Sequence, residues 1–134
     1  MFNFQKMAFL LIVILLNLEL LYGAPMKKTI MIDLDGVLDN YTVYTEEIPE
    51  IRKGAKDFVK KLSKDYELIL FTTRPSKQAV IWLQKNKIDK YFKDVTNVKT
   101  PAYIYLDDRA VQFEGDYDKT LDEINKFKAY WKTK

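Results

Sequence analysis

The apolar residues of this chain fall into short continuous runs and longer stretches with helical spacing. The continuous runs are 29–34, 67–72 and 103–106, each rich in β-branched or aromatic residues. Because they show little alternation between apolar and polar positions, they are typical of strands covered on both faces. A weaker run at 94–98 predicts one more short strand.

Helical spacing, in which apolar residues recur every three or four positions, lies between and after these runs. It is found at 55–62, at 79–83 and at 121–131. In the closing segment the stripe consists of Leu121, Ile124, Phe127 and Trp131. Strands that alternate with helices predict an α/β fold in which a parallel sheet has helices on both faces, a three-layer α/β/α sandwich.

Residues 1–25 form a separate hydrophobic leader. Its ten consecutive apolar residues suit a secretory signal better than a membrane span, which needs about 20. However, Tyr22 stands two positions before Ala24, which makes a poor cleavage pattern. The other interpretation is that translation begins at Met26. The protein is then expected in the cytoplasm, and otherwise it is secreted or anchored to a membrane through the leader, while residues 26–134 form the folded domain in both cases.

The composition of the chain bounds its chemistry. Its 134 residues are 48% hydrophobic, which suffices for one core, and the net charge of +3 is spread over lysines interleaved with acids. Such a charge pattern does not indicate nucleic-acid binding. With no cysteine and no histidine, a Ser-His-Asp triad, a cysteine nucleophile and the usual zinc sites are excluded. The four glycines form neither a phosphate loop nor a dinucleotide-binding fingerprint.

The first predicted strand ends with two aspartates on alternate positions, Asp33 and Asp35, followed by Gly36. Side chains at i and i+2 of a strand point the same way, so the two carboxylates converge. Each then raises the pKa of the other unless a cation lies between them, and this indicates a metal site. A calcium loop of the EF-hand type is excluded, because the 12-residue loop with its terminal glutamate is missing.

Polar residues also follow the other predicted strands. Thr72 ends the second, Asp107 and Asp108 end the last, and Lys99 lies just upstream of the last strand. Ligands of parallel sheets bind beyond the carboxyl ends of the strands. We therefore expect these residues to gather near the first acidic pair.

The order of these motifs resembles the haloacid dehalogenase (HAD) superfamily, whose members are mostly phosphatases and phosphotransferases. The matching segments are IMIDLDGVLDN, LILFTT, Lys99 in NVKTP, and YIYLDDR. The resemblance covers residues 28–114 and implies a Rossmann-like fold with a central, mainly parallel sheet. Receiver domains use a similar set of acids, threonine and lysine, but in a different order, and the late pair Asp107-Asp108 disfavours them.

The resemblance implies a role for each acidic residue. Asp33 would be the nucleophile that forms an aspartyl-phosphate, and Asp35 would be the general acid and then the general base. Asp33, Asp107 and the backbone carbonyl of Asp35 would hold one Mg²⁺, with Asp108 completing or orienting the site. Oxygen ligands of this kind suit a hard cation.

The remaining candidates would bind the phosphate. Thr72 and Lys99 would stabilise negative charge in the transition state, and Lys99 would also hold Asp33 in place. Gly36 would let the chain turn sharply and bring its amide toward the phosphate. Three more residues near the same rim are candidates for substrate binding: Thr73, Arg74 and Arg109. For the two arginines, ordinary surface ion pairs are an equally good interpretation.

The spacing between the motifs leaves no room for a cap domain. Only the segment 39–49 could form a small flap, with Tyr41 and Tyr44 as possible contacts. Asp35 favours a phosphatase or phosphotransferase over the dehalogenases and ion pumps of the superfamily. We expect a magnesium-dependent phosphatase that hydrolyses a small or larger phosphorylated substrate. The alternatives are a phosphotransferase and a noncatalytic phosphate- or metal-binding protein that acts through partners.

Overall fold

The computed structural model describes residues 4–23 and 25–133. Four helices and four strands make up its regular elements, together with two short 3₁₀ helices. In chain order they are α1 (Phe4–Tyr22), β1 (Lys28–Asp33), α2 (Ala55–Asp65), β2 (Tyr66–Phe71), α3 (Ser76–Lys85), η1 (Asp89–Tyr91), β3 (Phe92–Thr96), β4 (Ile104–Leu106), α4 (Tyr117–Lys126) and η2 (Tyr130–Thr133).

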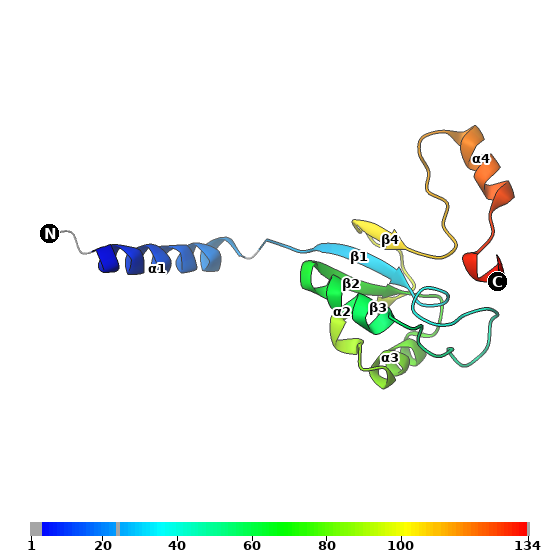
Figure 1. The fold of residues 1–134 in the computed structure, drawn as a ribbon, viewed down its shortest axis with the longest axis horizontal. Coiled ribbons are helices and arrows are strands. Elements are labelled where there is room, and N and C mark those ends of the chain that lie inside the picture. Colours follow the sequence, from blue (N-terminus) through cyan, green and yellow to red (C-terminus); the bar gives the residue numbers. More distant parts are fainter. Residues whose placement is uncertain (1–3, 24, 134) are drawn as a thin grey trace.

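The four strands form one parallel sheet in the order β3-β2-β1-β4 (Figure 1). β1 pairs with β2 from Lys28 to Asp33, and on its other side Ile32 lies opposite Leu106 of β4. The carboxyl end of β1 therefore lies between the ends of two neighbouring strands. All four predicted strands are confirmed, including the weak one, which begins two residues earlier than expected.

One face of the sheet carries the core. Side chains alternate across each strand, so every second residue of β1 and β2 shares this face, and the four most central are Ile30, Ile32, Leu68 and Leu70. None of them is more than 4% exposed. Val59 of α2 and Leu83 of α3 pack into the same cluster, and both helices lie on the same side of the sheet in Figure 1. Burial of this face fixes the register of the strands and with it the positions of their ends.

The opposite face is crossed by the connection between β3 and β4, residues 97–103. The Thr100 hydroxyl lies 3.6 Å from the sulfur of Met31, and the Tyr103 amide donates to the Thr29 carbonyl at 2.8 Å. The α/β class and the parallel, Rossmann-like sheet are confirmed. Helices were expected on both faces of the sheet. On the face opposite α2 and α3, the connection 97–103 lies where a packed helix was expected.

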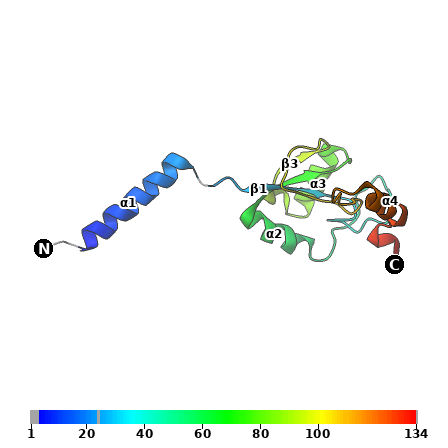
Figure 2. The same cartoon turned by 90° about the horizontal axis from the view of Figure 1, so that it is seen from above.

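The closing helix is shorter than predicted. α4 ends at Lys126, because Phe127 has a non-helical backbone with ψ 129°, and Trp131 lies in η2. Leu121 and Ile124 are 58% and 55% exposed, so the apolar stripe of α4 is not part of the core. In both views α4 lies beyond the carboxyl ends of the strands (Figures 1 and 2).

The leader contains α1, which extends away from the sheet in both views (Figures 1 and 2). Its apolar side chains are exposed, for example Phe9 at 71%. Within residues 4–23 and 25–133, we find no helix with the length and apolar content that crossing a membrane requires. Ala24 of the predicted cleavage pattern lies outside the described residues. The division into a leader and a domain at 26–134 stays a prediction.

Candidate active site

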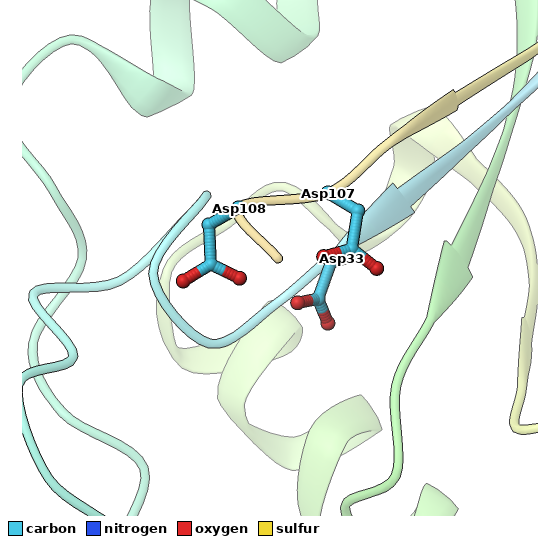
Figure 3. A group of neighbouring side chains, drawn as sticks. All are labelled: Asp33, Asp107 and Asp108. Carbon is cyan, nitrogen blue, oxygen red and sulfur yellow. The ribbon is translucent and has the colours of Figure 1, made fainter. Parts of the chain in front are cut away.

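Three carboxylates from two neighbouring strand ends meet at one edge of the sheet (Figure 3). Asp33 is the last residue of β1, and Asp107 and Asp108 follow β4 directly. One oxygen from each carboxylate lies within 4.8 Å of the other two. The predicted approach of the late acidic pair to Asp33 is thus present, and it follows from the parallel pairing of β1 with β4. The predicted convergence of the Asp33 and Asp35 carboxylates is not, because β1 ends at Asp33 and Asp35 lies beyond the strand.

Burial and mutual repulsion of the three carboxylates favour the binding of a cation between them. The pKa of Asp33 is raised from 3.8 to about 7, first by burial and then by the negative charges of Asp107, Asp108 and Asp35, while the hydrogen bond from the Leu34 amide opposes the rise. A carboxylate cluster with only oxygen donors is the kind of site that hard divalent cations occupy. A cation there would offset both the burial and the repulsion.

The two acids of the late pair have different environments. Asp107 accepts a hydrogen bond from the Arg109 amide at 2.7 Å. The Asp108 side chain is only 1% exposed, and its Oδ2 accepts a hydrogen bond from the Trp131 indole. Its Oδ1 is buried and has no hydrogen-bond partner among the described residues. An unpartnered buried carboxylate oxygen is costly, and a metal ligand is a natural role for it.

Asp35 does not join the acidic group through its side chain. Its carboxylate faces Arg74, whose Nε lies 2.9 Å from Oδ2 and whose Nη2 lies 2.7 Å from Oδ1. Arg74 is predicted to bind substrate, but its side chain is only 1% exposed and forms an ion pair with Asp35 instead. The hydrogen bonds to Asp35 raise the pKa of Arg74 further above its ordinary value. The surface-ion-pair interpretation of Arg74 is also wrong, because Arg74 is buried and the Asp35 side chain is only 18% exposed.

The loop after Asp35 is held by a residue that sequence reasoning missed. Asp39 is fully buried, and its Oδ1 accepts hydrogen bonds from the amides of Gly36 at 2.8 Å and Tyr41 at 3.0 Å. The Gly36 amide is therefore not free for a phosphate, contrary to the prediction, although Gly36 does turn the chain with φ 81°. Burial raises the pKa of Asp39 to about 6. Its signal in the sequence was an acid directly after two apolar residues, VLD.

A cleft of about 350 Å³ lies in front of the acids. Its lining includes both acidic motifs, the threonines after β2 and the aromatic side chains of the predicted flap: Asp33, Asp35, Tyr41, Tyr44, Phe71, Thr72, Thr73, Asp107 and Arg109. Most of the predicted site residues thus share one cleft. Thr72 is 3% exposed, and its hydroxyl accepts a hydrogen bond from the Arg74 amide at 3.2 Å.

Four predicted site residues do not line this cleft: Gly36, Arg74, Asp108 and Lys99. Of these, Lys99 is the one that contacts neither acidic pair in the described part of the chain. Its Nζ lies 4.4 Å from the centroid of the Tyr105 ring, and the side chain is exposed. It is not among the residues that line the cleft. The physical reason is the path of the segment 97–103, which crosses the sheet face opposite α2 and α3 and carries Lys99 toward solvent.

Comparisons with known proteins agree with this fold. A conserved protein from Bacteroides thetaiotaomicron is similar in structure, with a TM-score of 0.54 and 22% sequence identity over 78% of this chain and 94% of that protein. This likeness concerns the fold alone. No curated protein matches the sequence. The family model of the NLI interacting factor-like phosphatases matches residues 28–132, which is most of the chain. The chain therefore belongs to the NLI interacting factor-like phosphatase family, a family of HAD-type phosphatases.

Proposed function

We propose that this chain is a magnesium-dependent phosphomonoesterase that works through an aspartyl-phosphate on Asp33. The observation that carries the proposal is the convergence of Asp33, Asp107 and Asp108, which place one carboxylate oxygen each within 4.8 Å of the other two at the carboxyl ends of β1 and β4. These three carboxylates would hold Mg²⁺, and the backbone carbonyl of Asp35 is a further predicted ligand. When bound, the ion neutralises negative charge on the carboxylates and on the phosphate oxygens.

In the first step, a carboxylate oxygen of Asp33 attacks phosphorus. A new O–P bond forms, and the bond between phosphorus and the leaving oxygen breaks with its electron pair on that oxygen. Asp35 lines the same cleft and would supply the proton that the leaving oxygen needs. Thr72, whose buried hydroxyl also lines the cleft, would donate a hydrogen bond to the transferring group.

In the second step, water attacks the phosphorus of the aspartyl-phosphate. Asp35 takes the proton of that water, the bond between Asp33 and phosphorus breaks, and inorganic phosphate leaves. Arg74 fixes the Asp35 carboxylate for this role, because a guanidinium fork holds a carboxylate in one orientation.

The proposed substrate is a phosphomonoester, either small or part of a larger phosphorylated molecule. Tyr44 is 65% exposed and the Arg109 side chain is 52% exposed, so both are accessible at the cleft. A cationic group there suits a second anionic group of a substrate. Arg109 keeps its predicted role in substrate binding on this argument, and Thr73, also exposed at the cleft, keeps its own.

The test is hydrolysis of p-nitrophenyl phosphate by the full chain with Mg²⁺, with EDTA, and in the variants Asp33→Asn and Asp57→Asn. Asp57 is an exposed aspartate of α2 and serves as the matched control. We expect activity that EDTA abolishes and Mg²⁺ restores, a loss of about three orders of magnitude or more in Asp33→Asn, and normal activity in Asp57→Asn. Activity that persists in both EDTA and Asp33→Asn would contradict the proposal. Mg²⁺ binding without any hydrolysis would favour the noncatalytic alternative.

A further inference from the structure

The C-terminal segment η2 lies against the loop that carries the first acidic motif. The Tyr130 hydroxyl donates a hydrogen bond to the Gly36 carbonyl, although the two residues are 94 positions apart in the sequence. The neighbouring Trp131 donates its indole N–H to Asp108. Segment η2 thus contacts the loop of the first acidic motif and the second acidic motif. The mechanism proposed above uses neither of these two contacts.

The Trp131 ring is fixed by several contacts. The ring of Tyr41 meets it edge-on, with centroids 5.2 Å apart and an interplanar angle of 78°. The Arg109 guanidinium carbon lies 5.2 Å from the indole centroid. Ala129, two residues before Trp131, is 4% exposed and anchors the segment. The contacts with Tyr41 and Arg109 hold the indole ring, and with it the N–H, at one position.

This N–H makes the two oxygens of Asp108 unequal. An indole nitrogen is a donor only, so the oxygen it contacts, Oδ2, is the one turned toward Trp131. The Arg109 Nε is also on this side, 3.9 Å from Oδ2. The other oxygen, Oδ1, is buried and has no hydrogen-bond partner in the described part of the chain. The carboxylate is oriented by one oxygen, and the second remains available.

We propose that Trp131 is a positioning residue that orients Asp108 so that Oδ1 faces the cation shared with Asp33 and Asp107. The inference rests on the proposed function only in that it needs the same divalent cation. Groups that hydrogen-bond to metal ligands fix the orientation of those ligands, and their loss typically weakens metal affinity about 10- to 100-fold. Trp131 would act on metal binding without touching the substrate.

The test is calorimetric titration of Mg²⁺ into the full chain without substrate. Trp131→Phe keeps an aromatic ring and removes the N–H. The matched control is Trp82→Phe, which removes another buried indole donor, 2.8 Å from the Pro49 carbonyl and outside the cleft. We expect Mg²⁺ affinity to fall by about tenfold or more in Trp131→Phe and to stay at the wild-type value in Trp82→Phe.

Fluorescence gives a second measurement that does not require the Trp131 variant to fold. The chain has two tryptophans, so Trp131 is the only one left in Trp82→Phe. Its emission should change as Mg²⁺ is added, over the concentration range found by calorimetry. Three results would overturn the inference. Trp131→Phe could bind Mg²⁺ as tightly as wild type, both variants could bind it equally weakly, or the emission of Trp131 could stay unchanged as Mg²⁺ is added. A wild-type chain that binds Mg²⁺ and shows these effects but hydrolyses no phosphomonoester would contradict the proposed function and leave the inference supported.

Discussion

Arg74 makes three hydrogen bonds to Asp35: its Nε contacts both carboxylate oxygens, at 3.1 and 2.9 Å, and its Nη2 contacts Oδ1 at 2.7 Å. The same guanidinium donates to the Thr45 carbonyl in the segment 39–49, and it lies 4.6 Å from the centroid of the Tyr44 ring. One buried cation therefore connects the first acidic motif, the segment after β2 and the predicted flap.

The first prediction concerns the stability of this connection. Arg74→Ala leaves a partly buried carboxylate without its partner, and we expect the free energy of unfolding to fall by about 3 kcal/mol or more. The matched control is Lys93→Ala, which removes an exposed ion pair with Glu67 (2.9 Å) and should cost roughly 1 kcal/mol or less. Urea denaturation measures both. Equal losses in the two variants would mean that the Arg74 pair has no structural role.

The second prediction concerns the role of Asp35 as an acid. A poor leaving group needs a proton in the transition state, whereas p-nitrophenolate leaves without one. Asp35→Asn should therefore lower kcat/KM for an alkyl phosphate by about a hundredfold or more and for p-nitrophenyl phosphate much less. Since kcat/KM reports the step that forms the aspartyl-phosphate, the later role of Asp35 as a base does not interfere. Equal losses for both substrates would remove Asp35 as the acid.

The third prediction concerns the pH dependence of stability in the metal-free chain. Burial raises the pKa of Asp33 from 3.8 to about 7, so the folded chain keeps this proton to a higher pH than the unfolded chain. The contribution of Asp33 to stability is then fully present below about pH 3.8 and is lost as the pH rises through about 7. Asparagine cannot ionise and has no such loss.

Urea denaturation of wild type and Asp33→Asn at several pH values in EDTA checks this. The free energy of unfolding of Asp33→Asn should increase relative to wild type as the pH rises from about 4 to about 7.5. Mg²⁺ binds the ionised form, so its affinity for the wild type should rise over the same range. A difference between the two proteins that stays constant with pH would show that Asp33 titrates normally.

The fourth prediction uses two glycines with similar backbones. Gly36 and Gly54 have φ values of 81° and 88°, so alanine strains the backbone at both positions. A Cβ at Gly36 would also lie 2.9 Å from Asp108 Cγ and 3.1 Å from the Trp131 Nε1, while a Cβ at Gly54 meets nothing within 4 Å. Only Gly36→Ala should therefore displace Asp108.

We expect both variants to lose about 1 to 2 kcal/mol of stability through the backbone and Gly36→Ala to lose more. Calorimetry should show weaker Mg²⁺ binding in Gly36→Ala and unchanged binding in Gly54→Ala. If both variants bind Mg²⁺ like the wild type, the close packing of Gly36 against Asp108 is not needed for the site.

The meeting of Asp33 with Asp107 could be predicted from the sequence, because it needs only two neighbouring parallel strands and their ends. Apolar runs mark strands, and the crossover rules place their carboxyl ends at the same edge. The same reasoning predicted that α2 and α3 lie between successive strands. Each of these features is local or follows from topology.

The position of Lys99 could not be predicted in this way. It depends on the path of the connection 97–103, in which residues 99–102 show neither helical nor strand periodicity. The contact of Trp131 with Asp108 could not be predicted either, because helical spacing placed Trp131 on the apolar stripe of the closing helix. The helix in fact ends at Lys126, and the following segment η2 contacts Gly36 and Asp108. Periodicity shows which residues can share a face but not where a helix stops.

The most direct test of the account is to trap the covalent intermediate on Asp33. The full chain would be mixed with Mg²⁺ and a phosphomonoester, quenched in acid and treated with borohydride, which reduces an acyl phosphate to the alcohol. We predict that peptide mass spectrometry finds residue 33 converted to homoserine, only when Mg²⁺ is present. Hydrolysis of the substrate with residue 33 left as unmodified aspartate, or with the reduced residue at another position, would contradict the account.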